Sequence, residues 1–196
     1  MTNVKVSGTE IPRFEDVPLI KGEGKYTDDF QPDGLTYAAI LRSQHAHAKI
    51  VSVEVEAAKK IEGVIAVYTS EDLEIDQVPG MFHVKGSFEG QRDSKFSILA
   101  RESVRYTGEP IAIVIADDRY VAHEALSVVE VKYERLESSG DVWTSMAEDA
   151  PIVHIGKGKD NIALDWEYGD EKSTRAAFDD ADYIFELDMI NQKLHP

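Results

Sequence analysis

Two histidines, His45 and His47, are the residues of this chain whose type and spacing most suggest chemistry. In an extended segment, side chains two positions apart lie on the same face, and imidazole nitrogens are good metal ligands. Two ligands do not make a metal site, however, and no nearby Cys, Asp or Glu completes the set. We therefore expect no metal here and interpret the pair as part of a turn that packs or hydrogen-bonds against other groups.

The polar segment around these histidines, Arg42 to Ile50, has two competing interpretations. It lies between two predicted strands, and loops held by a scaffold commonly carry recognition. One interpretation is a docking surface for a partner subunit, with Arg42, His45 and His47 as contact residues. The other is a purely structural turn in which the histidines are buried.

Other patterns that suggest catalysis fail in detail. Gly22 to Thr27 resembles half of a phosphate-binding loop, but Tyr26 stands where the metal-binding Ser or Thr should be. The acidic pairs Asp117-Asp118 and Asp179-Asp180 adjoin predicted helices, where capping explains them better than acid–base chemistry. The sequence therefore predicts no catalytic, cofactor-binding or metal-binding residue in this chain.

The absence of cysteine removes several functional classes together. With 0 Cys, the chain has no disulfide, no thiolate nucleophile and no ligands for a cysteine-held iron–sulfur cluster. An iron–sulfur cluster that serves this protein must therefore lie on another chain.

The charge balance also excludes classes of partner. The 196 residues include 37 acidic and 21 basic side chains, for a net charge of −16. Such a surface repels phosphate backbones and anionic lipids, so we expect neither nucleic acid nor membrane as a partner. The N-terminus shows no secretory signal, and the longest apolar run, Ile111 to Ala116, is too short to span a bilayer. A cytoplasmic location is expected.

The strongest structural pattern is a strand, helix and strand over residues 111–136. Ile111 to Ala116 is typical of a strand covered on both faces, and Asp117-Asp118 can cap the helix that follows over 119–130. Val129 to Leu136 alternates apolar with charged residues, as a half-exposed strand does. Further strands are predicted over Leu35–Leu41, Ile50–Val55, Val64–Thr69 and Tyr183–Ile190, and short helices over Glu56–Ile61, from an N-cap at Ser70, and over Lys172–Asp180.

These elements divide the chain into four predicted parts. Residues 1–34 are irregular because Pro and Gly interrupt any period, and residues 74–95 are also predicted to be a loop. Residues 35–137 hold most of the strands and form the main domain. Residues 138–170 form an acidic, loop-rich connector, and the last part comprises residues 171–196. Together, residues 137–196 contain 14 acidic and 5 basic side chains.

Several segments resemble one family: the molybdenum-binding large subunit of the xanthine dehydrogenase, aldehyde oxidase and carbon monoxide dehydrogenase enzymes. The resemblance covers roughly residues 10–137, with family-like spacing between its segments. Those segments are Pro12–Asp16 with Tyr26–Asp29, Leu41–Ile50 (LRSQHAHAKI), Glu62–Thr69 (EGVIAVYT), Val104–Ala112 (VRYTGEPIA) and Tyr133–Leu136 (YERL). Glu137 departs from the family pattern, which has Pro at that position.

The resemblance implies a fold, a role and partners. The fold is the alpha/beta hammerhead domain, an α+β fold of small mixed sheets with a few short helices. Residues 171–196 resemble the entry into the molybdopterin-binding domain, whose pterin loops and catalytic glutamate lie beyond Pro196. The expected role is a structural and subunit-docking piece of a molybdenum hydroxylase that oxidises an aldehyde, a purine or carbon monoxide. Molybdopterin would be held by later domains of the large subunit, and iron–sulfur clusters and FAD by partner subunits.

The sequence leaves this role and two alternatives open. In the expected role the chain is a component of an enzyme, as a fragment or a split gene product. The first alternative is a stand-alone interaction or scaffold domain derived from the family without activity, and the second is a small metalloenzyme that uses His45 and His47. Pairing with a second copy of the chain through the predicted strand Tyr183–Ile190 is the expected route to a homodimer.

Overall fold

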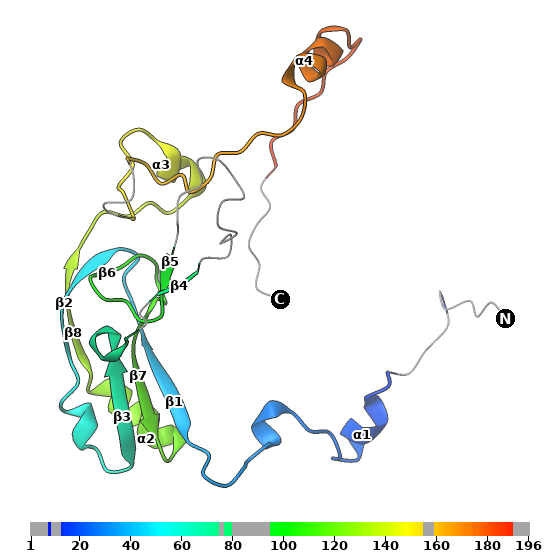
Figure 1. Ribbon diagram of the computed structural model, residues 1–196. Helices are drawn as coiled ribbons and strands as arrows, with labels where there is room; N and C mark the ends of the chain where they lie inside the picture. Colours follow the sequence, from blue (N-terminus) through cyan, green and yellow to red (C-terminus); the bar gives the residue numbers. More distant parts are fainter. Residues whose placement is uncertain (1–7, 9–12, 75–76, 80–94, 155–158, 190–196) are drawn as a thin grey trace. The chain divides into compact units, whose positions relative to one another are not determined.

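The computed structural model describes residues 8, 13–74, 77–79, 95–154 and 159–189 (Figure 1). The chain divides into two compact units. The first unit comprises Met1–Asp76 with Ser97–Ser138, and the second comprises Gln77–Phe96 with Ser139–Pro196. Among the described residues, the three clusters of buried hydrophobic side chains all lie in the first unit.

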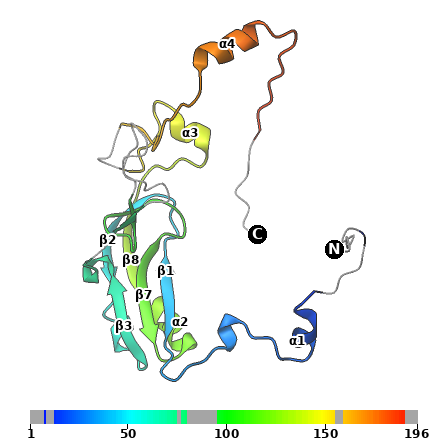
Figure 2. The ribbon, with the colours of Figure 1, turned by 45° about the vertical axis from the view of Figure 1, so that its right-hand side comes forward.

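A three-stranded antiparallel sheet forms the centre of the first unit (Figure 2). Its middle strand is β7 (Pro110–Ala116), which pairs with β1 (Tyr37–Arg42) on one side and β3 (Val64–Thr69) on the other. Ile111, Ala112, Val114 and Ala116 of β7 are fully buried. The prediction of a strand covered on both faces is therefore confirmed, since only a central strand between packed layers buries neighbouring side chains of both faces.

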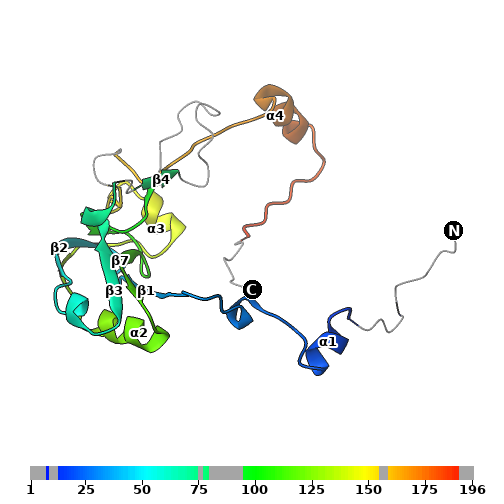
Figure 3. The same cartoon turned by 60° about the horizontal axis from the view of Figure 1, so that its bottom comes forward.

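Helix α2 (Arg119–Ser127) packs against all three strands of this sheet (Figure 3). Its start is set by Asp118, whose Oδ1 accepts hydrogen bonds from the backbone N–H of Tyr120 at 2.7 Å and Val121 at 3.4 Å. The predicted cap is thus confirmed. The small side chains Ala122 and Ala125 are buried on the face that contacts the sheet.

A second three-stranded sheet lies in the same unit, in the order β6-β2-β8. β2 (Ala48–Glu54) pairs antiparallel with β8 (Glu130–Arg135) and with the short β6 (Ser103–Val104). The helix predicted over Glu56–Ile61 is a shorter 3-10 turn, η2 (Ala58–Lys60).

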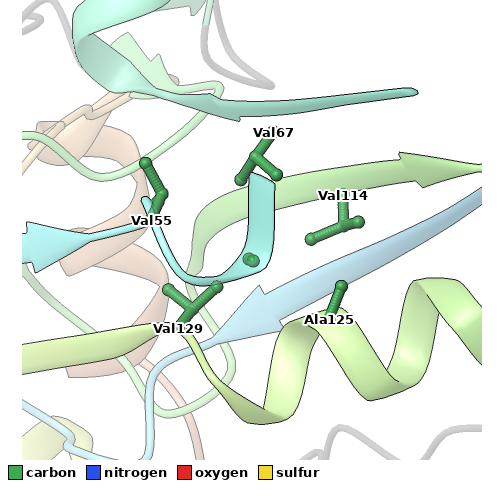
Figure 4. Close-up of a cluster of buried hydrophobic side chains, with 6 residues drawn as sticks. Val55, Val67, Val114, Ala125 and Val129 are labelled. Atoms are coloured by element: carbon green, nitrogen blue, oxygen red, sulfur yellow. The ribbon is translucent and has the colours of Figure 1, made fainter. Parts of the chain in front are cut away.

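The main hydrophobic cluster joins the two sheets and the helix (Figure 4). Figure 4 shows Val67 and Val114 from the first sheet converging with Ala125 of α2. Val55, which follows β2, Ala58 of η2, and Val129, which lies between α2 and β8, complete the group. Residues from five separate predicted elements are therefore buried together, which is what makes this unit one folded domain.

The structure corrects two details of the sequence interpretation in the first unit. Residues 1–34, expected to be irregular, contain α1 (Asp16–Ile20) and the 3-10 turn η1 (Thr27–Asp29), both without buried residues. The turn η3 (Ser70–Asp72) is capped by Thr69 and not by Ser70. Thr69 Oγ1 accepts from the N–H of Glu71 at 3.3 Å, and hydrogen bonds from Thr69 lower the pKa of Asp72.

The segment 74–95, expected to be a loop, contributes to a two-stranded sheet. β4 (Gln77–Pro79) pairs with β5 (Lys95–Ser97). Residues 75–76 and 80–94 of the expected loop lie outside the described residues. No helix in the described ranges is both long and apolar enough to cross a membrane.

The second unit contains α3 (Val142–Met146) and α4 (Glu171–Asp179). The helix predicted from Lys172 is confirmed as α4, whereas α3 was not predicted within the connector. The strand predicted over Tyr183–Ile190 is wrong for its described part, because residues 183–189 form no strand (Figure 1). A strand exists only through pairing, and no described strand pairs with these residues. Ile190 lies outside the described residues.

Candidate docking site

The polar segment singled out in the sequence is a bent loop between β1 and β2, centred on Ser43. Ser43 is only 3% exposed, and its backbone is held from two sides. Its N–H donates to the carbonyl of Glu109 at 2.9 Å, and its carbonyl accepts from the N–H of Gly108 at 2.8 Å. The hydroxyl of Ser43 also bonds to both backbone groups of His45, at 3.0 Å and 2.8 Å. The loop therefore has one defined conformation, fastened to residues 108–109.

Arg42 is the most accessible of the three predicted contact residues. Its side chain lies on the surface at the end of β1, and its Nη1 donates to the carbonyl of Gly108 at 3.0 Å. This single bond fixes the direction of the guanidinium group. Four further N–H donors of an arginine remain for a partner carboxylate or carbonyl.

His45 is half-buried and packs on Tyr133 of β8. The two ring centroids are 4.7 Å apart and the rings are at 80°, an edge-to-face contact. Burial raises the pKa of the Tyr133 hydroxyl, while its hydrogen bond with Ser43 acts in the opposite direction. Tyr133 is therefore neutral at physiological pH and serves as a platform for His45.

His47 is buried, at 5% exposure, and fastens the loop to the end of β8. Its Nδ1 lies 2.8 Å from the carbonyl oxygen of Glu137. Because a carbonyl can only accept, Nδ1 carries the proton and donates it. The N–H of Leu136 in turn donates to the carbonyl of His47 at 3.1 Å. His47 thus has the buried position of the structural interpretation, and it can act in docking only by holding the loop in place.

Glu109 completes this region and was not singled out in the sequence. The carboxylate is buried, at 4% exposure, and accepts a hydrogen bond from the backbone N–H of Arg105. The guanidinium Nη1 of Arg105 lies 3.7 Å from Glu109 Oε1. A sequence signal existed, since Glu109 is a lone acid directly before the apolar run that starts at Pro110.

The geometry brings His45 and His47 into one loop but gives them different neighbours, Tyr133 and Glu137. Across the described ranges, no group of three or more His, Asp or Glu side chains could hold a metal ion. The chemistry that the loop offers is hydrogen bonding and ring contact.

The second unit has a groove between α3 and residues 161–165. Its volume is about 820 Å³, and Val142, Met146, Ile162 and Leu164 provide apolar lining. Asn161 orders the groove: its side-chain N–H groups donate to the carbonyls of Ser145 at 3.1 Å and Pro151 at 3.0 Å, and its Oδ1 accepts from Val153 at 2.9 Å.

Comparison with known proteins identifies the family of the folded unit. Residues 21–137, more than half of the chain, match the family described as aldehyde oxidase and xanthine dehydrogenase, a/b hammerhead domain. The chain belongs to this family. The resemblance noted in the sequence is thereby confirmed, and so is the α+β hammerhead fold.

The relatives are large subunits of molybdenum enzymes. The chain is 33% identical to the carbon monoxide dehydrogenase large chain of Afipia carboxidovorans, over 96% of this chain and 24% of that protein. It is 33% identical to the xanthine dehydrogenase molybdenum-binding subunit of Escherichia coli, over 74% of this chain and 19% of that subunit. The hammerhead chain thus spans about a quarter of the length of the first of these relatives.

A solved structure agrees in fold beyond the hammerhead domain. The carbon monoxide dehydrogenase reconstituted from Oligotropha carboxidovorans is 33% identical, with a TM-score of 0.73. The match covers 90% of this chain and 22% of that chain. The likeness therefore includes residues of both units of the hammerhead chain.

Replacing His47 by alanine is expected to lower the free energy of unfolding by about 1–3 kcal/mol. The variant loses the bond to the carbonyl of Glu137 and removes a ring that is only 5% exposed, which leaves a cavity under the loop. The measurement is urea unfolding followed by circular dichroism. His123→Ala, at an exposed position on α2, is the matched control and should change the stability by less than about 0.5 kcal/mol. Equal stability of the two variants would contradict the structural role of His47.

Proposed function

We propose that this chain is the N-terminal piece of the large subunit of a molybdenum hydroxylase, and that it serves as a structural and subunit-docking domain without catalytic residues of its own. One observation supports the proposal above others. Nearly the whole chain, 96%, aligns with only 24% of a carbon monoxide dehydrogenase large chain. A match of this kind is expected of one part of a larger subunit.

The parts of the chain have separate roles in this proposal. Residues 35–137 form the hammerhead domain, 138–170 an acidic connector, and 171–196 the start of the molybdopterin-binding domain. The burial pattern supports this division. Among residues 139–154 and 159–189, none is fully buried, so this part has no core of its own.

The redox groups of the complete enzyme are proposed to lie elsewhere. Molybdopterin with molybdenum supplies the hydroxylation chemistry in the later domains of the large subunit, and partner subunits hold iron–sulfur clusters and FAD. The chain contains 0 Cys, so it offers no thiolate ligands for an iron–sulfur cluster. The substrate class is an aldehyde, a purine or carbon monoxide, and the location is cytoplasmic.

The docking role is proposed for the exposed part of the loop, Arg42 and His45, with His47 as a positioning residue. The fixed direction of the Arg42 side chain and the platform under His45 support it, because a preorganised surface loses little entropy on binding.

Purified chain is expected to contain neither molybdenum nor iron and to show no flavin or cluster absorbance. Elemental analysis and an absorption spectrum test this, and stoichiometric metal would contradict the proposal.

A second measurement tests docking itself. Titration of the chain with the iron–sulfur subunit encoded in the same genome should show binding that the double variant Arg42→Ala, His45→Ala weakens at least roughly tenfold. His123→Ala should bind like the original chain. Binding that is the same for both variants would contradict the docking role. Absence of any binding, together with no large-subunit remainder in the genome, would favour the stand-alone scaffold.

A further inference from the structure

Glu109 is the one acidic side chain that is buried among the described residues. Removing a carboxylate from water is costly unless hydrogen bonds or a nearby cation compensate for the lost hydration. The contacts of this carboxylate lie within the first unit, so they do not depend on what covers the surface of that unit. They show which part of the structure the buried carboxylate holds in place.

The closest partner of the carboxylate is a backbone group. Glu109 Oε2 accepts a hydrogen bond from the N–H of Arg105. The guanidinium Nη1 of Arg105 lies 3.7 Å from Oε1, which is too long for a hydrogen bond. The Nε of the same guanidinium is buried and has no hydrogen-bond partner among the described residues. Because the two side chains are imperfectly paired, the bond to the backbone is the contact by which Glu109 most strongly fixes its surroundings.

This bond closes a tight turn over Tyr106–Glu109. The N–H of Glu109 donates to the carbonyl of Tyr106 at 3.2 Å, which is the hydrogen bond typical of a four-residue β-turn. Gly108, at the third position, has a φ of +94°, a left-handed conformation that glycine adopts without strain. The carboxylate reaches back across the turn to the N–H of Arg105, the residue that precedes it. The ends of the turn are therefore joined twice, once through the backbone and once through the side chain of Glu109.

The loop that presents Arg42 and His45 is fastened to this turn. The N–H of Gly108 donates to the carbonyl of Ser43 at 2.8 Å, and the N–H of Ser43 donates to the carbonyl of Glu109 at 2.9 Å. Arg42 Nη1 also donates to a carbonyl of the turn, that of Gly108, at 3.0 Å. His45 is held one step further away, through the bonds of both its backbone groups to the Ser43 hydroxyl. Each of these positions is therefore set by the conformation of the turn.

We propose that Glu109 is the positioning residue of the docking loop. Its carboxylate holds the turn closed by accepting from the N–H of Arg105, and the closed turn sets the place of Ser43 and the direction of the Arg42 guanidinium. The acceptor oxygen matters more than the negative charge, because the hydrogen bond is direct and the guanidinium is not within bonding distance. The consequence for docking rests on the function proposed above, whereas the consequence for the conformation of the loop does not.

Two variants of the full chain separate the acceptor from the charge. Glu109→Gln keeps a side-chain oxygen that can accept from the N–H of Arg105, and Glu109→Leu has a similar size but no acceptor. Hydrogen exchange of the backbone amides is measured by NMR. In Glu109→Leu the amides of Ser43 and Gly108 are expected to exchange roughly tenfold or more faster, and in Glu109→Gln less than about threefold faster. Amides in the middle of β7 should keep their rates in both variants, which a general loss of stability would not allow.

Titration with the iron–sulfur subunit of the same genome measures the consequence for docking. Glu109→Leu should weaken binding at least roughly fivefold, because a loop that is no longer preorganised loses more entropy on binding, and Glu109→Gln should bind like the original chain. Faster exchange with unchanged binding would support the positioning role of Glu109 and contradict the docking role proposed above. Unchanged exchange at Ser43 and Gly108 in Glu109→Leu, equal acceleration in the two variants, or the same acceleration in β7 would overturn the proposal.

Discussion

Ile111→Ala is expected to lower the free energy of unfolding of the first unit by about 2–5 kcal/mol. Ile111 is fully buried in the central strand β7 and belongs to the cluster that packs the second sheet against the first. Removal of its side-chain carbons loses their transfer free energy and leaves a cavity among Ala48, Ala100 and Val104, whose small side chains cannot fill it. The total stability of a domain is about 5–15 kcal/mol, so a substantial part would be lost.

Chemical unfolding followed by circular dichroism measures this effect. Ile65→Ala is the matched control, because it makes the same chemical change on β3 at a position that is 54% exposed. The Ile65→Ala variant should lower the free energy of unfolding by less than about 1 kcal/mol. A loss of stability at Ile111 no larger than at Ile65 would show that β7 is not the centre of the core.

Hydrogen exchange of the isolated chain is expected to differ by at least about 1,000-fold between β7 and residues 183–189. Amides of β7 are bonded to β1 or to β3, because this strand pairs on both sides, and they are expected to open only when the unit unfolds. Amides of 183–189 have no described backbone partner, and the 14 acids against 5 bases of residues 137–196 repel one another.

The measurement is made by NMR at a dilution where the chain is monomeric and no partner is present. The helix α4 provides an internal comparison, because its amides are hydrogen-bonded but its residues are all exposed, and intermediate exchange is expected there. Slow exchange throughout 183–189 in the monomer would contradict the structure of this segment.

Local patterns in the sequence were sufficient for the elements around β7. The run Ile111 to Ala116 predicted a buried strand because apolar side chains on both faces exclude an exposed position. Asp118 predicted the start of α2 because a carboxylate at this position accepts bonds from the otherwise unpaired N–H groups of the first turn. In both cases the cause lies within a few residues, so it can be read without knowing the rest of the chain.

The family and fold were also determined by the sequence, through ordered segments with family spacing that the match over residues 21–137 confirms. Subunit docking was not determined in this way, and it stays a prediction. The residue types of Arg42, His45 and His47 were compatible with a surface and with a buried turn.

Only the tertiary structure showed that His45 and His47 have different environments. His47 is buried because the carbonyl of Glu137, 90 positions later in the chain, reaches its Nδ1, and His45 is half-covered because Tyr133 lies beside it. The alternation of apolar and acidic side chains over Tyr183–Ile190 predicted a strand that the structure does not contain. Such an alternation shows only that the segment can form a strand where a sheet edge is present. Pairing is a property of two segments, and the described part of this chain contains no second segment for it. The sequence by itself therefore determined the elements whose stabilising contacts are local, while contacts between distant segments decided which residues are buried and which remain free to bind.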